Sequence, residues 1–392
     1  MKICLITMQA EPLLRLGIDA RCLNTPHIRG MGKYASELIK NADALAKVEW
    51  RFFADRPDTV FHKPVESGEI ELFDLKGYRF NTWEQIGLPW QARRAGIDIL
   101  HCIATTLPYW QAVPTIVTIH DTLMWKEDEL HLSYNKWYLH HLIPAAFKRC
   151  TAIITISESS RRDILELWPY LERKLHVIPH GVSDIYLNEQ SKILSPTFLD
   201  KVGPAPYFLY IGGSLARKRF GWAIKVLVNI DIPKIRLLVC GFSEAERTQA
   251  RQNIEPSLRD RIVFLPFIEE TYMAQLYQQA VAVLYPTLYE GFGFPALEAQ
   301  AVGTPVLFSA LGSLIELIGP SAEILPPENL DAWVKTCQRL FYQRGEFNMR
   351  IPNKDAREWA QQFSWKVSST RHLELYRKVA EQTRSLLKSR FF

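Results

Sequence analysis

Short runs of apolar residues alternate along the chain with longer stretches of mixed polarity, and the runs form two series. The runs have the length of buried strands, and the mixed stretches have the length of helices. Buried strands that alternate with helices are typical of parallel sheets in α/β proteins. The first series comprises 98–104, 115–121, 152–157 and 175–181, and the second comprises 207–213, 235–242, 261–267, 281–287 and 304–310.

The two series predict two separate sheets joined by a linker. The stretch 183–206 between them is polar and contains three prolines, as interdomain connections often do. Ligands of open α/β sheets bind at the carboxyl ends of the strands, so two such sheets would supply two ligand-binding edges. A final stretch, 366–390, has the hydrophobic period of an amphipathic helix. The expected units are domains at 1–182 and 207–365, the linker 183–206 and a C-terminal helix at 366–392.

The composition limits the class of protein. The chain has 392 residues, of which 47% are hydrophobic and 12% aromatic, so two packed cores are expected and disorder is not. A formal net charge of +5 suits an anionic small molecule or a membrane surface better than nucleic acid. The six cysteines form no Cys-x-x-Cys pair, which favours reduced thiols in the cytoplasm. No apolar run reaches the roughly 20 residues that span a bilayer, so any membrane role would be peripheral.

The stretch LYEGFGFPALEAQAVGTP, residues 288–305, combines a strand end, a glycine turn and a helix start. Pro295 suits the first helical position and Gly303 suits the helix end. The start of a helix presents N–H groups and a positive dipole end, which favour phosphate. Glu290 and Glu298 flank the turn, and carboxylates accept hydrogen bonds from sugar and ribose hydroxyls. The stretch therefore predicts a sugar-nucleotide site, although a helix-capping glutamate and a solvent-facing one would leave the same pattern.

Two further glycine turns follow the same logic. YIGGSLARKRF, residues 210–220, follows an apolar run, and its glycines would let the backbone approach a phosphate while Arg217 and Lys218 neutralise it. Gly30-Met31-Gly32 also enters an expected helix, but Gly-x-Gly alone is a weak signal.

His120 ends the run 115–121, where an imidazole could donate to a sugar hydroxyl or phosphate or serve as an ordinary loop histidine. The histidines do not cluster at metal-ligand spacing and no Asp-x-Asp occurs, so we expect no metal site.

Taken together, these segments resemble glycosyltransferase family 4, a family of retaining transferases with the GT-B architecture. That architecture has two facing Rossmann-like α/β domains and a C-terminal helix that crosses back to the first domain. The resemblance extends over residues 15–380 and rests on the spacing of Glu290 and Glu298 and on the order of the other motifs. Those motifs are Gly30 to Gly32, the His120 segment, TISESSRRDI (155–164), VIPHGV (177–182), the Arg217–Lys218 turn and Trp365.

The resemblance implies a role for each matching residue. Lys218 would hold the donor diphosphate with Arg217 beside it, and Glu290 would bind hydroxyls of the donor sugar. Glu298 would bind the ribose, and His120 would reach the transferring sugar from the N-terminal domain. The remaining implied binding residues are Gly30, Gly32, Gly212, Ser214, Gly291, Phe292, Gly293 and Phe294, with Phe264 beside the nucleobase.

Two departures from the family pattern stand out. Gly213 occupies a position where many relatives have arginine, which weakens the phosphate role of Arg217. The expected first strand is RLGIDAR, residues 15–21, so residues 1–14 form an extension without an assigned role.

The resemblance also implies the reaction. The acceptor hydroxyl would attack from the side of the departing diphosphate, whose oxygen takes the proton, while the protein positions reactants and stabilises charge. GIDARCL, RGMGKYASELI and HDTLMW are most similar to bacterial mannosyltransferases of surface polysaccharide assembly. GDP-mannose is the first expected donor and a UDP-sugar the second, with no cofactor.

The expected partners are the nucleotide-sugar and a glycan or polyprenyl-diphosphate-linked oligosaccharide acceptor, with no nucleic acid. The segments 79–96 and 133–150 mix Trp, Tyr, Arg and Lys, so peripheral contact with the cytoplasmic face of the inner membrane is expected. The competing classes are a nucleotide-sugar epimerase or phosphorylase of the same architecture and a non-catalytic sugar-nucleotide binder. A dinucleotide oxidoreductase would need a third glycine after Gly32, where the chain continues Lys33-Tyr34-Ala35.

Overall fold

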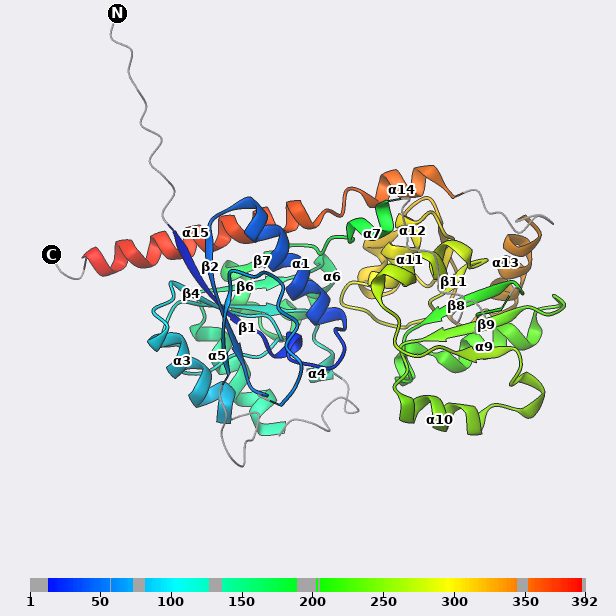
Figure 1. The fold of residues 1–392 in the computed structure, drawn as a ribbon, viewed down its shortest axis with the longest axis horizontal. Coiled ribbons are helices and arrows are strands. Elements are labelled where there is room, and N and C mark those ends of the chain that lie inside the picture. Colours follow the sequence, from blue (N-terminus) through cyan, green and yellow to red (C-terminus); the bar gives the residue numbers. More distant parts are fainter. Residues whose placement is uncertain are drawn as a thin grey trace, which may run out of the picture. The chain divides into compact units, whose positions relative to one another are not determined.

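The structure is a computed structural model that describes residues 13–389 except 57, 73–81, 127–135, 189–201, 204 and 344–351. Most of the unassigned extension 1–14 and most of the expected linker 183–206 therefore lie outside the described residues. The described chain forms two compact units (Figure 1). The first unit comprises residues 1–154, 167–176 and 369–392, and the second comprises 155–166 and 177–368.

The first unit contains a sheet of seven strands in the order β3-β2-β1-β4-β5-β6-β7, counted over the described residues. Its strands are β1 (Leu14–Asp19), β2 (Val48–Ala54), β3 (Glu69–Leu72), β4 (Ile99–Cys102), β5 (Thr115–Ile119), β6 (Ala152–Thr155) and β7 (Leu175–Val177). The helices of this part of the chain are α1 (Gly30–Leu45), α3 (Leu88–Arg94), α4 (Leu123–Lys126) and α5 (Ile143–Arg149).

The second unit contains a parallel sheet of six strands in the order β10-β9-β8-β11-β12-β13, again over the described residues. Its strands are β8 (Tyr207–Ile211), β9 (Arg236–Cys240), β10 (Ile262–Phe264), β11 (Val283–Leu284), β12 (Val306–Phe308) and β13 (Ala322–Ile324). Its helices are α6 (Glu158–Leu167), α7 (Asp184–Leu187), α9 (Phe220–Asn229), α10 (Glu244–Asn253), α11 (Glu270–Gln279), α12 (Phe294–Ala301), α13 (Leu330–Gln343) and α14 (Lys354–Ala360).

Both faces of the second sheet are buried, because successive strand residues point to opposite sides. Leu209 and Leu238 pack in one core with residues of α7, α11 and α12. Phe208 and Leu237 pack in the other core with α9 and α13, where Trp333 is fully buried. Parallel strands that are apolar on both faces are what the continuous hydrophobic runs predict.

The sequence prediction missed three strands, β2, β3 and β13. In β2, VEWRFFA, the half-buried Glu49 and Arg51 interrupt the apolar run, and they pair with each other at 2.9 Å. Arg51 also pairs with Glu69 of β3, which is mostly exposed along its length. Strands β2 and β3 therefore lack a continuous apolar run, because they carry charged residues that pair with one another. A search for apolar runs does not find such strands.

The units differ from the expected domain ranges because packing does not follow chain order. Residues 155–166, which carry most of α6, pack with the second unit although they follow a strand of the first sheet. Asp184 to Leu187 form a short helix within the expected linker, and Tyr186 is buried in the core of the second unit.

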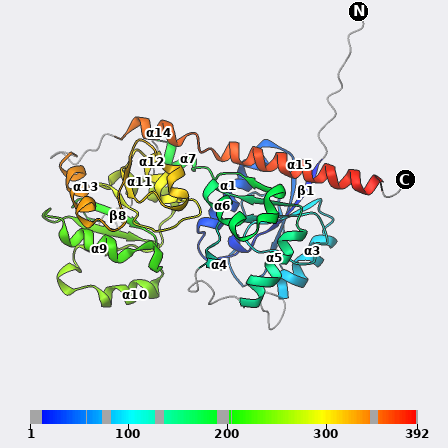
Figure 2. The ribbon, with the colours of Figure 1, turned by 180° about the vertical axis from the view of Figure 1, so that it is seen from behind.

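The C-terminal helix α15 (Trp365–Ser389) packs from residue 369 onward with the first unit, as expected for a helix that returns to the first domain. Figures 1 and 2 show it lying along that unit in both views. Leu373, Tyr376 and Val379 are buried, as the hydrophobic period predicts, and Ser369 donates to the carbonyl of Leu38 at 3.2 Å.

A continuous set of hydrogen bonds, here called the hydroxyl–imidazole chain, joins α15 to the first sheet. The hydroxyl of Tyr376 lies 2.7 Å from His101 Nδ1, and His101 Nε2 lies 2.8 Å from Thr118 Oγ1. Thr118 Oγ1 lies 2.9 Å from the Tyr34 hydroxyl, which lies 2.9 Å from His372 Nε2. If each group donates toward His372, every hydroxyl proton has an acceptor, whereas the reverse direction leaves the proton of Tyr376 without one among the described residues. This direction requires a neutral His101.

The hydroxyl–imidazole chain predicts acid sensitivity. Burial, followed by the nearby His372 and His120, lowers the pKa of His101 well below its usual value. Near pH 6.5 His101 therefore takes up a proton in the unfolded chain but not in the folded protein. Because the unfolded state then binds more protons, the free energy of unfolding should fall as the pH drops below 6.5. The slope should approach 1.4 kcal/mol per pH unit for each such histidine, at most about that size. Urea unfolding at pH 7.5, 6.5 and 5.5 measures it.

The change that tests this prediction is His101→Gln, which should remove about one proton from the pH slope. His141→Gln is the matched control, since His141 is exposed and should leave the slope unchanged. Equal slopes in wild type and His101→Gln would contradict the prediction.

Candidate active site

The order of the second sheet brings the two predicted glycine turns together. β8 and β11 are parallel neighbours, with Leu209 opposite Val283 and Tyr210 opposite Leu284. The turn after β8 and the turn after β11 therefore leave the same edge of the sheet. This edge is also where the strand order reverses, which is the usual ligand site of such sheets.

Three charged side chains from the two turns form one cluster. Lys218 Nζ donates to Glu290 Oε1, and Arg217 Nη1 lies 3.5 Å from Glu290 Oε2. Arg217 also donates to the carbonyl of Tyr289 at 2.8 Å. Burial alone would raise the pKa of Glu290, but the two cations outweigh it and hold the pKa below its usual value. The carboxylate is therefore ionised, and the cluster carries one net positive charge.

The pairing adds a feature that the sequence did not reveal. Lys218 and Glu290 were expected to bind the diphosphate and the sugar separately, whereas the structure pairs them directly. Their side chains are 14% and 11% exposed, so the pair is largely desolvated. An anion that bound there would meet cations already held in place by Glu290.

The glycines of the first turn are needed for close packing. A side chain on Gly212 would lie 2.7 Å from the Tyr210 hydroxyl, and Gly213 has a φ of +82°. The hydroxyl of Tyr210 donates within this turn, lying 3.0 Å from the carbonyl of Gly213. Ser214 donates to Glu246, which caps the start of α10, so its hydroxyl is already engaged in this structure.

The second turn leads into α12 as predicted. Gly293 has a φ of +106° and precedes the helix, and Pro295 lies in the first turn. Glu298, on the second turn, is buried and accepts a hydrogen bond of 2.6 Å from the Tyr277 hydroxyl. Tyr277 thus fixes the carboxylate that was expected to bind ribose, a contact that the sequence did not suggest.

Aromatic rings explain two further motifs of the sequence. His180 of VIPHGV stacks on Phe294 with ring centroids 5.1 Å apart, and it meets Phe292 edge-on at 5.0 Å. Trp365 lies beside both His180 and Phe294, at 5.4 Å and 6.2 Å between ring centroids. The motifs around His180 and Trp365 therefore pack against Phe292 and Phe294 of the turn between β11 and α12.

Phe264, which was expected beside the nucleobase, has its ring in the core of the second unit. It is buried among Phe220 and Phe242, with ring centroids 5.7 Å and 5.4 Å away. Phe264 is the last residue of β10, and Phe267, three residues further on, is 51% exposed. Apolar runs alone cannot tell which aromatic residue of such a strand end faces the core.

The third glycine turn lies at the start of α1 in the first unit. The helix begins at Gly30, where a side chain would meet no atom within 4 Å. A side chain on Gly32 would lie only 2.6 Å from the carbonyl oxygen of Cys22. Packing therefore accounts for Gly32, while the backbone at Gly30 is open to a ligand.

His120 follows β5 and is a neutral ring with a defined tautomer. Its Nε2 donates to the carbonyl of Ile103 at 2.9 Å, and Tyr34 packs edge-on against it at 5.3 Å. Burial lowers the pKa of His120 to about 4, which the bond to Ile103 offsets only in part. Because Nε2 holds the proton, Nδ1 can only accept, so the expected donation to a sugar hydroxyl or phosphate does not fit this tautomer.

A buried ion network at the carboxyl edge of the first sheet was missed by the sequence analysis. Arg21 Nε donates to Asp19 at 2.8 Å, and Arg21 Nη2 lies 3.0 Å from Glu84. Glu84 also accepts hydrogen bonds from Thr106 and Tyr138. Burial raises the pKa of Glu84, while Arg21 opposes that shift. The network joins four separate segments of the chain, and no local motif announces such contacts.

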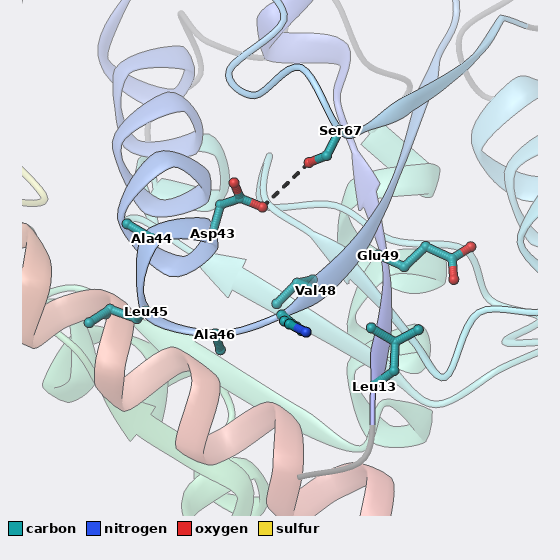
Figure 3. A pocket seen from close by; sticks show the side chains of 9 residues that line it. Leu13, Asp43, Ala44, Leu45, Ala46, Val48, Glu49 and Ser67 are labelled. Atoms are coloured by element: carbon teal, nitrogen blue, oxygen red, sulfur yellow. Dashed lines mark hydrogen bonds between the residues drawn. The ribbon is translucent and has the colours of Figure 1, made fainter. Parts of the chain in front are cut away.

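A surface pocket lies away from these residues. Figure 3 shows it beside the end of α1 and the start of β2, where Asp43 accepts a hydrogen bond of 3.5 Å from Ser67. The edge of the sheet at this pocket holds the amino ends of β1 and β2, opposite to the edge with His120. None of its lining residues is a predicted site residue, so we assign it no role.

Comparison with known proteins agrees with the geometry. The family model "Glycosyltransferase Family 4" matches residues 28–184, and the model "Glycosyl transferases group 1" matches residues 195–359. The chain is a glycosyltransferase with both of these domains. The two models together cover the second sheet and the strands of the first sheet from β2 onward, and they include the three glycine turns described above.

Two distant relatives cover most of the chain. The chain is 24% identical to an uncharacterized glycosyltransferase of Methanocaldococcus jannaschii, over 97% of this chain and 99% of the relative. It is 26% identical to O-antigen chain mannosyltransferase B of Escherichia coli, over 89% and 96%. The solved structure of Anabaena HepE with UDP-glucose matches with a TM-score of 0.68 at 16% identity, over 95% and 99%. That structural match shows the GT-B fold.

The charged cluster predicts a strong coupling between Lys218 and Glu290. Lys218→Met or Glu290→Gln alone should each lower the free energy of unfolding by about 3 kcal/mol, because a largely buried charge loses its partner. The double variant should cost less than the sum, with a coupling of about 1–3 kcal/mol. Urea unfolding of the four proteins measures this coupling.

Lys335→Met is the matched control for the lysine change, since Lys335 is exposed on α13. It should shift the free energy of unfolding by less than about 0.5 kcal/mol. Additive effects of Lys218→Met and Glu290→Gln would show that the pair is not formed in solution.

Proposed function

We propose that this glycosyltransferase transfers mannose from GDP-mannose, with retention at the anomeric carbon, to a glycan or lipid-linked oligosaccharide acceptor. The observation that supports the proposal best is the net positive cluster of Arg217, Lys218 and Glu290 at the switch point of the second sheet. The likeness to an O-antigen chain mannosyltransferase supports the choice of sugar.

In this mechanism the protein acts on the leaving diphosphate. Lys218 and Arg217 would stabilise the charge that develops as the glycosidic bond breaks, together with the N–H groups of the turn 291–294. Glu290 holds those cations and would orient the sugar hydroxyls, so it acts as a positioning group and not as a nucleophile. The cations and amides give the diphosphate its counter-charge without requiring a metal ion.

The second candidate donor is a UDP-sugar. The HepE structure that matches this chain contains UDP-glucose. Its low identity supports only the fold, so the choice between donors rests on the binding experiment below.

We also propose that the first unit binds the acceptor at the cytoplasmic face of the inner membrane. Among the described residues, no helix has the length and apolar character to cross a bilayer. The candidate for peripheral contact is a surface around α3 and α5, here called the aromatic–basic surface. Its exposed residues are Trp90, Arg94, Tyr109, Trp110, Trp137, Lys148, Arg149 and Tyr170.

The aromatic–basic surface pairs each cation with a ring. Arg94 lies 4.7 Å from the ring of Trp90, and Arg149 lies 4.8 Å from the ring of Tyr109. Gln111 donates to the carbonyl of Ala146 at 3.0 Å and so joins the 107–111 loop to α5. Figure 2 shows α3 and α5 next to each other. Amphipathic rings with adjacent cations suit the headgroup region of an anionic bilayer.

The donor prediction is tested by thermal unfolding with GDP, UDP, GDP-mannose and UDP-glucose. At 100 times the dissociation constant, a ligand stabilises the folded state by about 2.7 kcal/mol, so Tm should rise by roughly 5 °C. GDP-mannose should give this shift in wild type and in the control Lys335→Ala, but not in Lys218→Ala. If only UDP-glucose raises Tm, the donor is a UDP-sugar and not GDP-mannose. If none of the nucleotides raises Tm, the proposed function is contradicted.

The membrane prediction is tested by co-sedimentation with anionic vesicles at low salt. Arg94→Glu with Arg149→Glu should weaken binding at least about tenfold, because each basic residue near the surface contributes about 1 kcal/mol. Arg259→Glu with Lys335→Glu, at two exposed positions of the second unit, is the control for the same change in net charge. Equal binding by both variants would show that the aromatic–basic surface is not the contact.

A further inference from the structure

The backbone of the turn that carries Glu290 is held by an unusual set of donors. The carbonyl of Tyr289 accepts from Arg217 at 2.8 Å and from Thr287 at 3.1 Å. The next carbonyl, that of Glu290, accepts from the Ser313 hydroxyl at 2.7 Å. These three contacts fix the first half of the turn.

Three serines hold the rest of the turn. The carbonyl of Gly291 accepts from Ser157 at 3.0 Å and from Ser160 at 3.3 Å. The carbonyl of Phe292 lies 2.9 Å from the hydroxyl of Ser313, which is thus shared between two carbonyls. Four successive carbonyls, from residue 289 to residue 292, therefore face donors of the second unit.

The amide groups of the same peptides must point the other way. The described chain has no cis peptide bond, and in a trans peptide the N–H lies opposite to the C=O. The N–H groups of residues 291 to 293 are consequently turned away from the serines. Within the described part of the chain these three N–H groups have no hydrogen-bond acceptor. Successive amides that are left open in a turn form a site for an anion.

The serines are well placed to impose this direction. Ser157, Ser160 and Ser313 are all at most 1% exposed, so no water competes for their hydroxyls. The amide of Ser160 donates to the Ser157 hydroxyl at 3.0 Å, which directs the proton of Ser157 toward Gly291. Buried hydroxyls that donate to carbonyls of the turn give it a rigid support.

Helix α6, which carries Ser160 and directly follows Ser157, is itself anchored in the second unit. The carboxylate of Glu316 accepts from the amides of Glu158 and Ser159, at 3.0 Å and 2.8 Å, at the start of α6. The Tyr289 hydroxyl donates to Asp163 one turn further along. The segment TISESSRRDI is thus a brace for the turn, although it follows a strand of the first sheet in the sequence.

We propose that Ser157, Ser160 and Ser313 are positioning residues that aim the amides of residues 291–293 at the donor diphosphate. The inference rests on the proposed function, because it takes the anion to be the diphosphate of a nucleotide-sugar. None of the three hydroxyls would touch the ligand. Each acts through a carbonyl, and removal of the hydroxyl lets the peptide rotate so that its N–H no longer points at the phosphates.

The test compares ligands with and without phosphate. Ser313→Ala and the double change Ser157→Ala with Ser160→Ala should weaken the binding of GDP or UDP by about tenfold, since one or two amide contacts to an anion are lost. The affinity for guanosine or uridine, which lack the diphosphate, should stay within about twofold. Isothermal titration measures both, and circular dichroism confirms that each variant is folded.

Ser321→Ala is the matched control. Ser321 is also a buried serine of the second unit that donates to a carbonyl, that of Thr304 at 3.2 Å, but it lies at the start of β13, at the opposite edge of the sheet. The Ser321→Ala variant loses the same kind of hydrogen bond as the other serine variants. It should therefore lower Tm by a similar amount but leave the affinity for diphosphate unchanged. A loss of stability without a loss of diphosphate affinity is what a purely structural role would give.

The outcomes separate the inference from the proposed function. If wild type binds GDP or UDP and the serine variants bind it equally well, the inference is wrong and the proposed function stands. If the variants lose nucleoside and diphosphate affinity equally, the serines only support the fold and the inference is wrong. If wild type binds GDP, UDP and inorganic pyrophosphate not at all, the proposed function fails and the inference falls with it.

Discussion

The second unit depends on one electrostatic constraint, the pairing of Glu290 with Lys218 and Arg217. A buried carboxylate is costly unless cations and hydrogen bonds replace its water. The turn after β11 can carry Glu290 only because the turn after β8 brings both cations to it, and this requires β8 and β11 to be neighbours. The strand order β10-β9-β8-β11-β12-β13 of the sheet is thus the condition for the charged cluster. The surplus positive charge is what remains for an anionic ligand.

The first unit meets a related constraint in a different way. Its carboxyl edge buries Asp19, Arg21 and Glu84, whose formal charges sum to −1, and Glu84 also accepts a hydrogen bond from the Thr106 hydroxyl. Such a network gives no net attraction for a phosphate, but it fixes the loops that follow β1 and β4. The two sheets share a topology, yet one edge keeps a surplus of positive charge and the other does not. This difference fits a division between binding a charged donor and positioning an uncharged hydroxyl.

The sequence predicted the fold class and the turns, because both depend on local patterns. Apolar runs indicate strands that are buried on both faces, and Gly293 with Pro295 marks a turn into a helix wherever it occurs. The sequence could not predict the pairing of Lys218 with Glu290, since the two residues are separated by 72 positions and meet only through sheet order. The same holds for Tyr277 on Glu298 and for Arg21 on Glu84. Strand β2 was missed because its charges are paired across the sheet.

The serines at the start of α6 show why some functional residues resist local analysis altogether. Ser157 and Ser160 stand in a segment whose resemblance to the family is clear, but their residue type suggests only a helix start. Their effect lies in the carbonyl that they contact, 134 and 131 positions away. A backbone amide has no side chain to mark it in the sequence, so an anion site built from amides is visible only through the groups that hold the opposite carbonyls. For this glycosyltransferase, the residues that shape the phosphate site therefore include ones that no phosphate would touch.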